Sequence, residues 1–257
     1  MRSLVVIPTY NEADNLEPLS MAILSAGDFD LLIIDDNSPD GTGRVAEELA
    51  QRHRPRVSAL HRPSKMGLGS AYVAGFKYAL DNAYEFVYQM DADFSHSPQD
   101  LVRLHEAMTG SPADVVLGSR YVAGGGTRNW PRSRELLSRA GSLYARTVLG
   151  INVADLTGGF KGFRRRALEL LDLDAIHSTG YSFQIETTYR CLLAGCKLVE
   201  VPIVFEERRK GKSKMAGAII LEALLVVWRL RLETAQKQIE QVVRDLLGML
   251  LRYRGAR

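Results

Sequence analysis

The sequence has few of the features that define disulfide-rich, membrane-spanning or secreted proteins. Only two of its 257 residues are cysteine, and both, Cys191 and Cys196, fall in a stretch with the pattern of a helix. They are more simply read as small core residues than as a disulfide, which favours a reducing compartment. The apolar run at 219–228 is broken by Glu222 and followed by Arg229, so it is too short to span a bilayer. Because the first residues lead straight into a strand pattern, no signal peptide is expected.

Two further absences narrow the chemistry. The segment "PTYNEADN" at 8–15, directly after the first apolar stretch, contains no glycine, and the chain has no P-loop pattern. Dinucleotide-dependent redox enzymes and ordinary ATPases use such glycines to bring the backbone close to phosphate, so both classes are poor fits. The formal net charge is only +3, and the five histidines show no metal-ligand spacing. A generally basic nucleic-acid binder is therefore not expected, and no nucleic-acid partner is predicted.

Alternating strand and helix patterns fill the first half of the chain. The segments with strand character are 3–8, 29–35, 56–61, 84–90 and 113–119, and those with helix character are 12–26, 42–53, 68–82 and 99–109. This order predicts an α/β fold of Rossmann-like type, with a mostly parallel sheet covered by helices on both faces. The second half is less regular: it has a Gly-rich, cationic loop at 122–134, helices at 134–149 and 182–195, a strand at 197–205, and a long terminal helix after about 214.

Acidic residues follow three of the predicted strands. They are Glu12, the pair Asp35 and Asp36, and the pair Asp91 and Asp93 in "MDADFSH". The carboxyl ends of parallel strands meet at one edge of a sheet, where such folds bind ligands. Neighbouring carboxylates repel each other and phosphate, but they hold phosphate well through Mg²⁺ or Mn²⁺. A lone D-x-D is weak evidence, because aspartates at strand ends often cap the next helix; here several strand ends agree.

Eight segments of the chain carry a resemblance to a known family. They are "IPTYNEADNL" (7–16), "IIDDNSPDGT" (33–42), "KMGLGSAY" (65–72), "MDADFSHSP" (90–98), "GSRY" (118–121), "NWPRSR" (129–134), "DLTGGFKGFRR" (155–165) and "FEERRKGKSKM" (205–215). In these segments the chain resembles the GT-A glycosyltransferases of family 2, and more narrowly the dolichol-phosphate or polyprenol-phosphate mannose synthases. The resemblance runs in register from residue 4 to about 218. It implies transfer of mannose from GDP-mannose to the phosphate of a polyprenol, with inversion to a β-linked product.

The resemblance also implies roles for individual residues. The guanosine and ribose pocket would be lined by Pro8, Tyr10 and Glu12, and the base would be contacted by Ile34 and Asp36. The Mg²⁺ or Mn²⁺ ion and the diphosphate would be held by Asp91, Ala92 and Asp93. Phosphates and donor would be bound by Arg120, Arg208 and Lys214, and the acceptor phosphate by Arg134 together with Arg120. Asp91, Asp93, Arg120 and Arg134 would form the catalytic set. One departure concerns the metal: some relatives have Gln two residues beyond the D-x-D as a metal contact, whereas this chain has Ser95.

The charges of the implied substrates indicate the mechanism. A phosphate monoester is already an anion near neutral pH, so as a nucleophile it needs no general base. His96 lies beside the D-x-D, but a polar residue at the start of the next helix is the favoured interpretation for it. What the reaction needs is cations that bring two anions together, so positioning and electrostatics are expected to dominate catalysis.

The C-terminal segment has the pattern of an amphipathic helix, and we divide the chain into a catalytic domain at 1–215 and a helical tail at 216–257. Apolar residues at helical spacing, mixed with Arg229, Arg231 and Arg244, are Ile219, Leu221, Leu224, Leu225, Trp228 and Leu232. Such a helix suits an anionic membrane surface or a membrane-anchoring partner. Packing on the catalytic domain or self-association as a coiled coil is an equally good interpretation. A peripheral position at the cytoplasmic face of a membrane is expected.

Two rival functions stay open at this point. One is a polyprenyl-phosphate glucosyltransferase that uses UDP-glucose, because the sequence does not fix the contacts that select the base and the sugar. The other is a non-catalytic subunit that binds a sugar nucleotide, although the retained acidic and basic positions argue against it. The polyprenol length, the choice between the two metals and the oligomeric state are not determined by the sequence.

Overall fold

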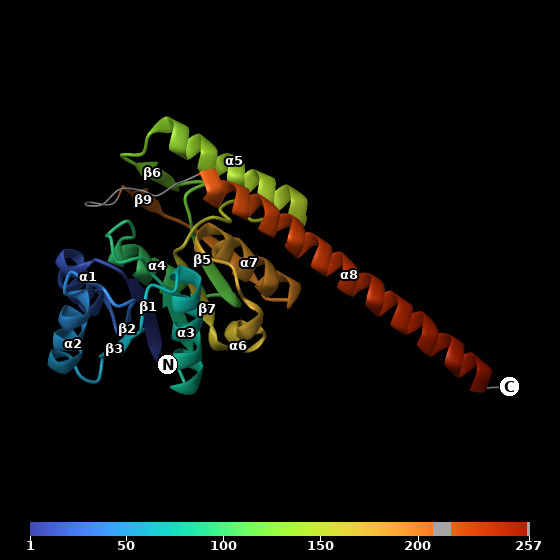
Figure 1. Ribbon diagram of the computed structural model, residues 1–257, viewed down its shortest axis with the longest axis horizontal. Coiled ribbons are helices and arrows are strands. Elements are labelled where there is room, and N and C mark those ends of the chain that lie inside the picture. The colour runs from blue at the N-terminus through green and yellow to red at the C-terminus, as the bar shows by residue number, and fades with distance from the viewer. Residues whose placement is uncertain (208–216, 256–257) are drawn as a thin grey trace.

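A computed structural model of the chain describes residues 1–207 and 217–255 (Figure 1). Its first half alternates strictly between strand and helix. The elements are β1 Ser3–Thr9, α1 Ala13–Ala26, β2 Asp30–Asp35, α2 Thr42–Arg52, β3 Val57–His61, α3 Leu68–Asp81, β4 Phe86–Gln89, α4 Pro98–Thr109 and β5 Val115–Ser119. The predicted α/β fold is confirmed for this part, and each predicted strand and helix is present within a few residues of its expected ends.

The second half adds shorter elements and one very long helix. They are β6 Gly126–Arg128, α5 Arg132–Leu149, β7 Lys161–Arg164, α6 Arg165–Glu169, a 3-10 turn at Leu173–Ala175, α7 Gly180–Leu193, β8 Leu198–Pro202, β9 Val204–Glu206 and α8 Gly217–Gly255. The loop predicted at 122–134 therefore contains a strand and the start of a helix. The strand predicted at 197–205 is two strands, because the chain leaves the main sheet after Pro202 and pairs with β6 instead.

The central sheet has seven strands in the order β3-β2-β1-β4-β7-β5-β8. Every neighbouring pair is parallel except the two that involve β7, which runs antiparallel to β4 and β5. Gly162 lets this short strand fit, since a methyl group there would lie 2.5 Å from the ring of Tyr88. The sequence analysis missed β7 because its four residues, "KGFR", have no strand-like apolar pattern.

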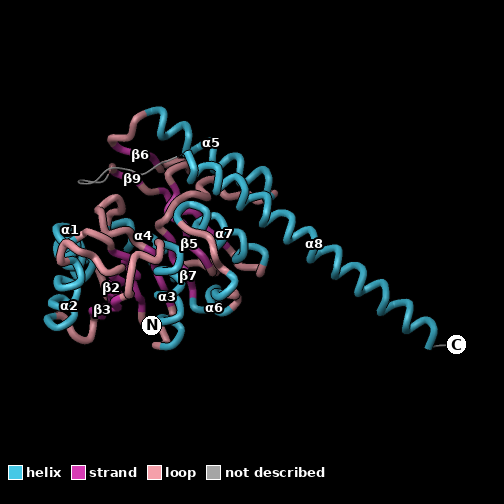
Figure 2. The backbone as a smooth tube through the Cα atoms, viewed as in Figure 1, coloured by secondary structure: helices cyan, strands magenta, loops and turns pink. Residues whose placement is uncertain are grey.

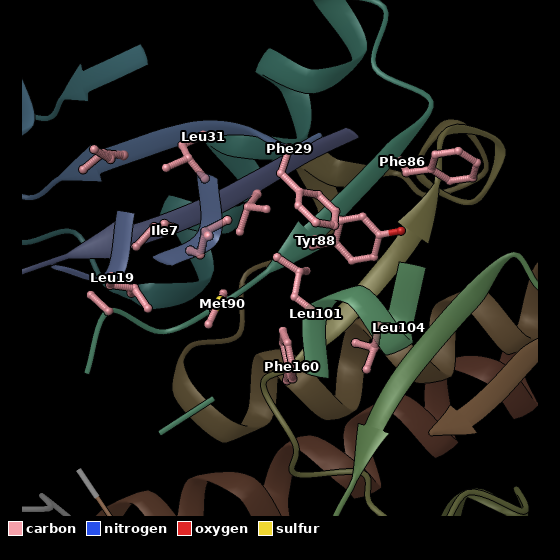
Figure 3. Packing of buried hydrophobic residues seen from close by; sticks show 14 of the residues in the cluster. Ile7, Leu19, Phe29, Leu31, Phe86, Tyr88, Met90, Leu101, Leu104 and Phe160 are labelled. Carbon is pink, nitrogen blue, oxygen red and sulfur yellow. The ribbon is translucent and has the colours of Figure 1, made fainter. Parts of the chain in front are cut away.

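Helices cover both faces of the sheet, as Figure 2 shows, and enclose three buried clusters. One cluster lies under α1, α2 and α4 and includes Phe29, Tyr88 and Leu101 (Figure 3). The second lies under α3, α6 and α7, and the third joins β5 to α5, α7 and α8. Each fully buried side chain of this size contributes roughly 1.5–3 kcal/mol, so the clusters fix the strand ends that carry the polar residues.

The first part of α8 belongs to the body of the protein. Val226, Val227 and Leu230 are buried in the third cluster beside Ile185 and Tyr189 of α7. The segment predicted as a helical tail at 216–257 therefore packs on the catalytic domain along its first part, which was one of the interpretations left open by the sequence. Only the later part of α8 projects beyond the body (Figure 1). Among the described residues, none of the helices has both the length and the apolar character needed to cross a bilayer.

Candidate active site

A polar pocket of about 870 Å³ opens at the carboxyl ends of the parallel strands. It is lined from five consecutive strand ends: by Tyr10 and Glu12 after β1, Asp40 after β2, Lys65 after β3, Asp91, Asp93 and His96 after β4, and Arg120 after β5. The second half of the chain closes it with Trp130, Arg134, Thr157, Gly159, Tyr181, Gln184 and Phe205. The edge of the sheet predicted to bind ligand is therefore the edge that carries the pocket.

The D-x-D loop is held in a fixed shape at the end of β4. The backbone N–H of Ser95 donates to Asp93 Oδ1 at 3.0 Å, and the hydroxyl of Tyr72 donates to Asp91 Oδ1 at 3.2 Å. Phe94, directly after Asp93, has φ of 61°, a conformation that bulky residues adopt at a cost of about 1–3 kcal/mol. Burial, with the charge of Asp91 beside it, raises the pKa of Tyr72 well above its ordinary value, so this hydroxyl stays protonated and stays a donor.

His96 lines the pocket and directly precedes Ser97, which caps α4 with its Oγ accepting from the N–H of Gln99 at 3.2 Å. The predicted place of His96 at the start of a helix is therefore compatible with the structure, and its ring also contributes to the pocket wall. The imidazole of His96 is buried and stacks on Phe160 with ring centres 4.7 Å apart. Burial lowers the pKa of His96 to about 4, so the ring is neutral near pH 7 and would hold an accepted proton poorly. This weak basicity agrees with a reaction that uses no histidine base.

Gln184 of α7 and Asp91 both lie close to Gly159 in the pocket lining. Its side chain is 3% exposed, and neither its amide nitrogen nor its amide oxygen has a hydrogen-bond partner among the described residues. A methyl group added at Gly159 would stand 3.5 Å from Gln184 Nε2 and 3.8 Å from Asp91 Oδ2. Buried amides are almost always paired, so this unpaired one indicates a polar ligand at this point.

The donor set fits a hard divalent cation. Within residues 1–207 and 217–255, no three His, Cys, Asp or Glu side chains gather as a complete metal site. Mg²⁺ does not need one, because it is commonly held by one or two carboxylates together with substrate phosphates. Asp91 and Asp93 supply two carboxylates on the pocket wall, and the unpaired amide of Gln184 also belongs to the pocket lining.

A buried lysine holds the backbone of Gln184 in place. Lys161 Nζ donates to the backbone oxygen of Gln184 at 2.6 Å, and the lysine side chain is fully buried. Burial lowers the pKa of Lys161 to about 7. A lysine so placed fixes the position of α7 relative to β7, and through it the distance of Gln184 from the D-x-D loop.

Arg120 is paired within the protein. Its guanidinium donates to Asp155 through Nε at 2.7 Å and through Nη2 at 2.6 Å, and Nη2 also donates to Thr157 at 2.8 Å. Both partners of this ion pair are buried. Across the described part of the chain, Nη1 is the nitrogen of this group that makes no hydrogen bond. The carboxylate of Asp155 neutralises much of the positive charge of Arg120, which was predicted to bind phosphate. Arg120 can therefore offer a phosphate a hydrogen-bond donor, but not a full positive charge.

Arg134 and Trp130 lie where the polar pocket meets an apolar groove. The groove, of about 90 Å³, runs between α5, α7 and α8, and it shares Trp130, Arg134, Thr157 and Tyr181 with the polar pocket. The guanidinium of Arg134 lies 4.1 Å from the ring centre of Trp130 and pairs with Glu207. Two buried N–H groups at this junction, Arg134 Nε and Trp130 Nε1, have no partner among the described residues. Unpaired donors of this kind suit an anion.

Several predicted site residues are placed differently from expectation. Asp36 is buried in an ion pair with Arg62 at 2.5 Å and does not line the pocket. The side chains of Ile34 and Ala92 pack in the core, and neither residue is part of the pocket lining. Pro8 is partly buried and lies outside the pocket lining. Tyr10, Glu12, Asp91, Asp93, Arg120 and Arg134 all line it, whereas Arg208 and Lys214 lie outside the described residues.

The structure also adds residues that the sequence analysis did not select. Lys65 lies over the ring of Tyr10 at 3.9 Å and brings a cation to the pocket rim. Asp40 accepts from the N–H of Thr42 at 3.0 Å at the start of α2. Trp130 and Gln184 are also added, and no local sequence pattern identifies either of them as a site residue. Lys65 could have been found from its place after β3, by the same strand-end argument that selected Asp91.

Solved structures with a similar fold define the class of protein. Glucosyl-3-phosphoglycerate synthase from Mycobacterium tuberculosis, in complex with Mn²⁺, uridine diphosphate and glucosyl-3-phosphoglycerate, is similar with a TM-score of 0.63 and 18% identity, over 90% of this chain and 79% of that one. A further mycobacterial protein gives 0.66 and 20%, over 88% and 74%. Together with the D-x-D pocket, this likeness identifies the fold as GT-A.

Sequence comparisons establish the family. Residues 4–171 match the family described as "Glycosyl transferase family 2". The chain is 49% identical to undecaprenyl-phosphate mannosyltransferase from Micrococcus luteus over 89% of this chain and 93% of that protein. It is 47% identical to polyprenol monophosphomannose synthase from Mycolicibacterium smegmatis over 90% and 88%. The chain belongs to glycosyltransferase family 2, and it is a glycosyltransferase.

Proposed function

We propose that this glycosyltransferase transfers mannose from GDP-mannose to the phosphate of a polyprenol, with inversion at the anomeric carbon. The names of the two relatives support the mannosyl group and the polyprenyl phosphate acceptor. Both relatives are named for transfer of a mannosyl group, whereas the rival donor, UDP-glucose, carries glucose. A divalent cation, Mg²⁺ or Mn²⁺, is proposed to bind at Asp91 and Asp93, whose carboxylates line the donor side of the pocket.

The observation that carries the proposal is the junction between the polar pocket and the apolar groove. A nucleotide-sugar donor needs a polar pocket near carboxylates, whereas an isoprenoid acceptor needs an apolar path that leads to the same point. The four shared residues make the two spaces neighbours, and the unpaired donors of Arg134 and Trp130 lie at their junction, where we propose that the acceptor phosphate is held. A soluble acceptor would give no reason for the apolar groove.

In the proposed reaction, the role of each site residue follows from its charge. Donor diphosphate and acceptor phosphate repel each other by about 3 kcal/mol at roughly 6 Å, for an effective dielectric near 20. When bound, a divalent cation supplies positive charge that stabilises the departing diphosphate. Arg134 and Trp130 hold the acceptor phosphate, and Arg120 adds a hydrogen-bond donor on the pocket wall. The acceptor attacks as an anion, so neutral His96 is left to shape the floor of the pocket.

The acceptor implies that the protein works at a membrane surface, and we place it at the cytoplasmic face. Helix α5 supports contact with a membrane surface: Leu137 lines the groove, and Leu136 and Leu143 on the same helix are exposed. Exposed leucines beside an apolar groove favour contact with acyl chains. Arg208 and Lys214 keep their proposed role on donor phosphates.

Replacing Arg134 with alanine tests the acceptor side of the proposal. The apparent KM for polyprenyl phosphate is expected to rise about 10–100-fold, because a hydrogen bond to a charged group contributes roughly 1.5–3 kcal/mol. The KM for GDP-mannose should change by less than about twofold. Steady-state kinetics with each substrate varied in turn provide the measurement.

Arg139→Ala is the matched control, because Arg139 lies on the same helix, pairs with Glu135 and is absent from the pocket lining. It should leave both constants near the wild-type values. Equal losses on both substrates in Arg134→Ala would instead assign Arg134 to the donor side or to a structural role.

A further inference from the structure

Helix α8 has two apolar faces, and only one of them is used by the body of the protein. The inner face consists of Val226, Val227 and Leu230, which are buried against α5 and α7. The outer face, here called the outer stripe, consists of Leu225, Trp228, Leu232, Ile239 and Val242. These five side chains are between 52% and 64% exposed. At about 100° per residue, the two faces point in roughly opposite directions.

The spacing along the outer stripe is that of a coiled coil. Intervals of three and four residues alternate from Leu225 through Trp228, Leu232, Ala235 and Ile239 to Val242. In the printed sequence the same alternation continues through Leu246 and Met249, so it covers more than three heptads. A strict seven-residue repeat drifts by about 20° per heptad around a straight helix. A second helix that winds around the first follows this drift, whereas a flat membrane surface does not.

The charges beside the stripe also favour a helical partner over an anionic surface. Exposed side chains on the projecting part include both signs, with Arg231 and Arg244 set among Glu233, Glu240 and Asp245. An interfacial membrane helix is usually rich in lysine and arginine on its polar face. Alternating signs are typical of the solvated positions of a coiled coil. The positive charge expected from Arg229, Arg231 and Arg244 is therefore balanced by these acidic side chains on the part of α8 that leaves the body.

We propose that the outer stripe pairs with the same stripe of a second copy of this chain, so that α8 forms a two-helix coiled coil in a homodimer. A self-complementary stripe suits the two-fold symmetry of most homodimers. The catalytic body does not obstruct the pairing, because it packs on the opposite face of α8, and the projecting part of the helix is clear of it (Figure 1). None of the five residues of the outer stripe lines the polar pocket or the groove.

Sedimentation velocity of the full-length protein, without lipid or detergent, tests this proposal. The wild type is expected to be a dimer at micromolar concentration. Ile239→Lys should weaken the dimer by about 100-fold or more, because each copy would bury a lysine at a core position of the coiled coil. Glu240→Lys is the matched control: it introduces the same side chain at the next residue, off the stripe, and should remain a dimer. Both residues are exposed in the single chain, so both variants should stay folded, with the circular dichroism spectrum of the wild type.

Leu232→Lys serves as a second stripe variant and should behave like Ile239→Lys. A monomeric wild type, or an Ile239→Lys protein that dimerises as well as the wild type, overturns the proposal. Cosedimentation with anionic phosphatidylglycerol vesicles distinguishes the dimer from the main alternative, in which the outer stripe binds a membrane. A monomeric wild type whose vesicle binding is lost in Ile239→Lys but kept in Glu240→Lys would assign the stripe to a membrane. Transfer activity does not enter either readout, so these results are independent of the proposed reaction.

Discussion

Asp91→Asn is expected to lower the transfer rate by about 10³-fold or more while the protein stays folded. The amide has nearly the shape of the carboxylate, and its oxygen can still accept the hydrogen bond from the buried hydroxyl of Tyr72. What the variant loses is a negative charge at the point where a divalent cation is proposed to bind. The loss should appear in initial rates at saturating donor and acceptor, with Mg²⁺ and with Mn²⁺.

The control for this variant is Asp81→Asn, which makes the same chemical change at the exposed end of α3. It should transfer sugar at the wild-type rate. Circular dichroism and the melting temperature should be unchanged in both proteins. Near-normal turnover in Asp91→Asn, or full wild-type activity in excess chelator, would remove the metal-dependent mechanism.

Asp155→Ala is expected to destabilise the fold by about 3–5 kcal/mol, because it leaves the charge of Arg120 buried without its partner. Both oxygens of Asp155 are engaged with Arg120, and the carboxylate is fully buried. Denaturant unfolding at neutral pH measures this loss directly. The double variant Asp155→Leu with Arg120→Met should recover much of the stability, since replacing both partners removes the unpaired charge.

An exposed ion pair provides the comparison. Glu48 pairs with Arg44 one turn away on α2, with both side chains largely in solvent. Glu48→Ala should cost no more than about 1 kcal/mol. If Asp155→Ala costs as little, then the Arg120–Asp155 pair does not hold the β5 end of the pocket in place, and Arg120 regains its expected role as a free cation.

Most of the sheet could be predicted from the sequence because its strands are apolar runs separated by amphipathic helices. β7 could not, because the four residues "KGFR" become a strand only between β4 and β5, where the ring of Tyr88 requires glycine at 162. The break after Pro202 also depends on a distant partner, since β9 forms only where β6 is present to pair with it. The local sequence pattern predicts whether a segment is a strand or a helix, but the sheet that a short strand joins depends on its distant pairing partners.

The site shows the same division. Asp91 and Asp93 could be predicted because a strand end and its acidic pair are adjacent in sequence. Gln184 and Trp130 could not, since each lies far along the chain and becomes significant only as a buried polar group without a partner. The pairing of Arg120 with Asp155 is equally distant, and it changes how the charge of a correctly chosen residue is used.

Helix α8 illustrates a pattern that was present but incompletely interpreted. Its apolar residues indicate an amphipathic helix, and the structure shows that they form two faces rather than one. Sorting them required knowing which side the body occupies. Once Val226, Val227 and Leu230 are assigned to the core, the residues of the outer stripe are seen to keep a heptad spacing.

The central claim is that this chain transfers mannose to a polyprenyl phosphate. Its most direct test is a transfer assay with a panel of labelled nucleotide-sugars, one polyprenyl phosphate, and Mg²⁺ or Mn²⁺ with and without chelator. We expect label from GDP-mannose to enter the lipid fraction, with UDP-glucose inactive, and we expect chelator to stop the reaction. Preferential transfer from UDP-glucose would contradict the proposed donor, and no lipid-linked product from any donor would contradict the proposed function itself.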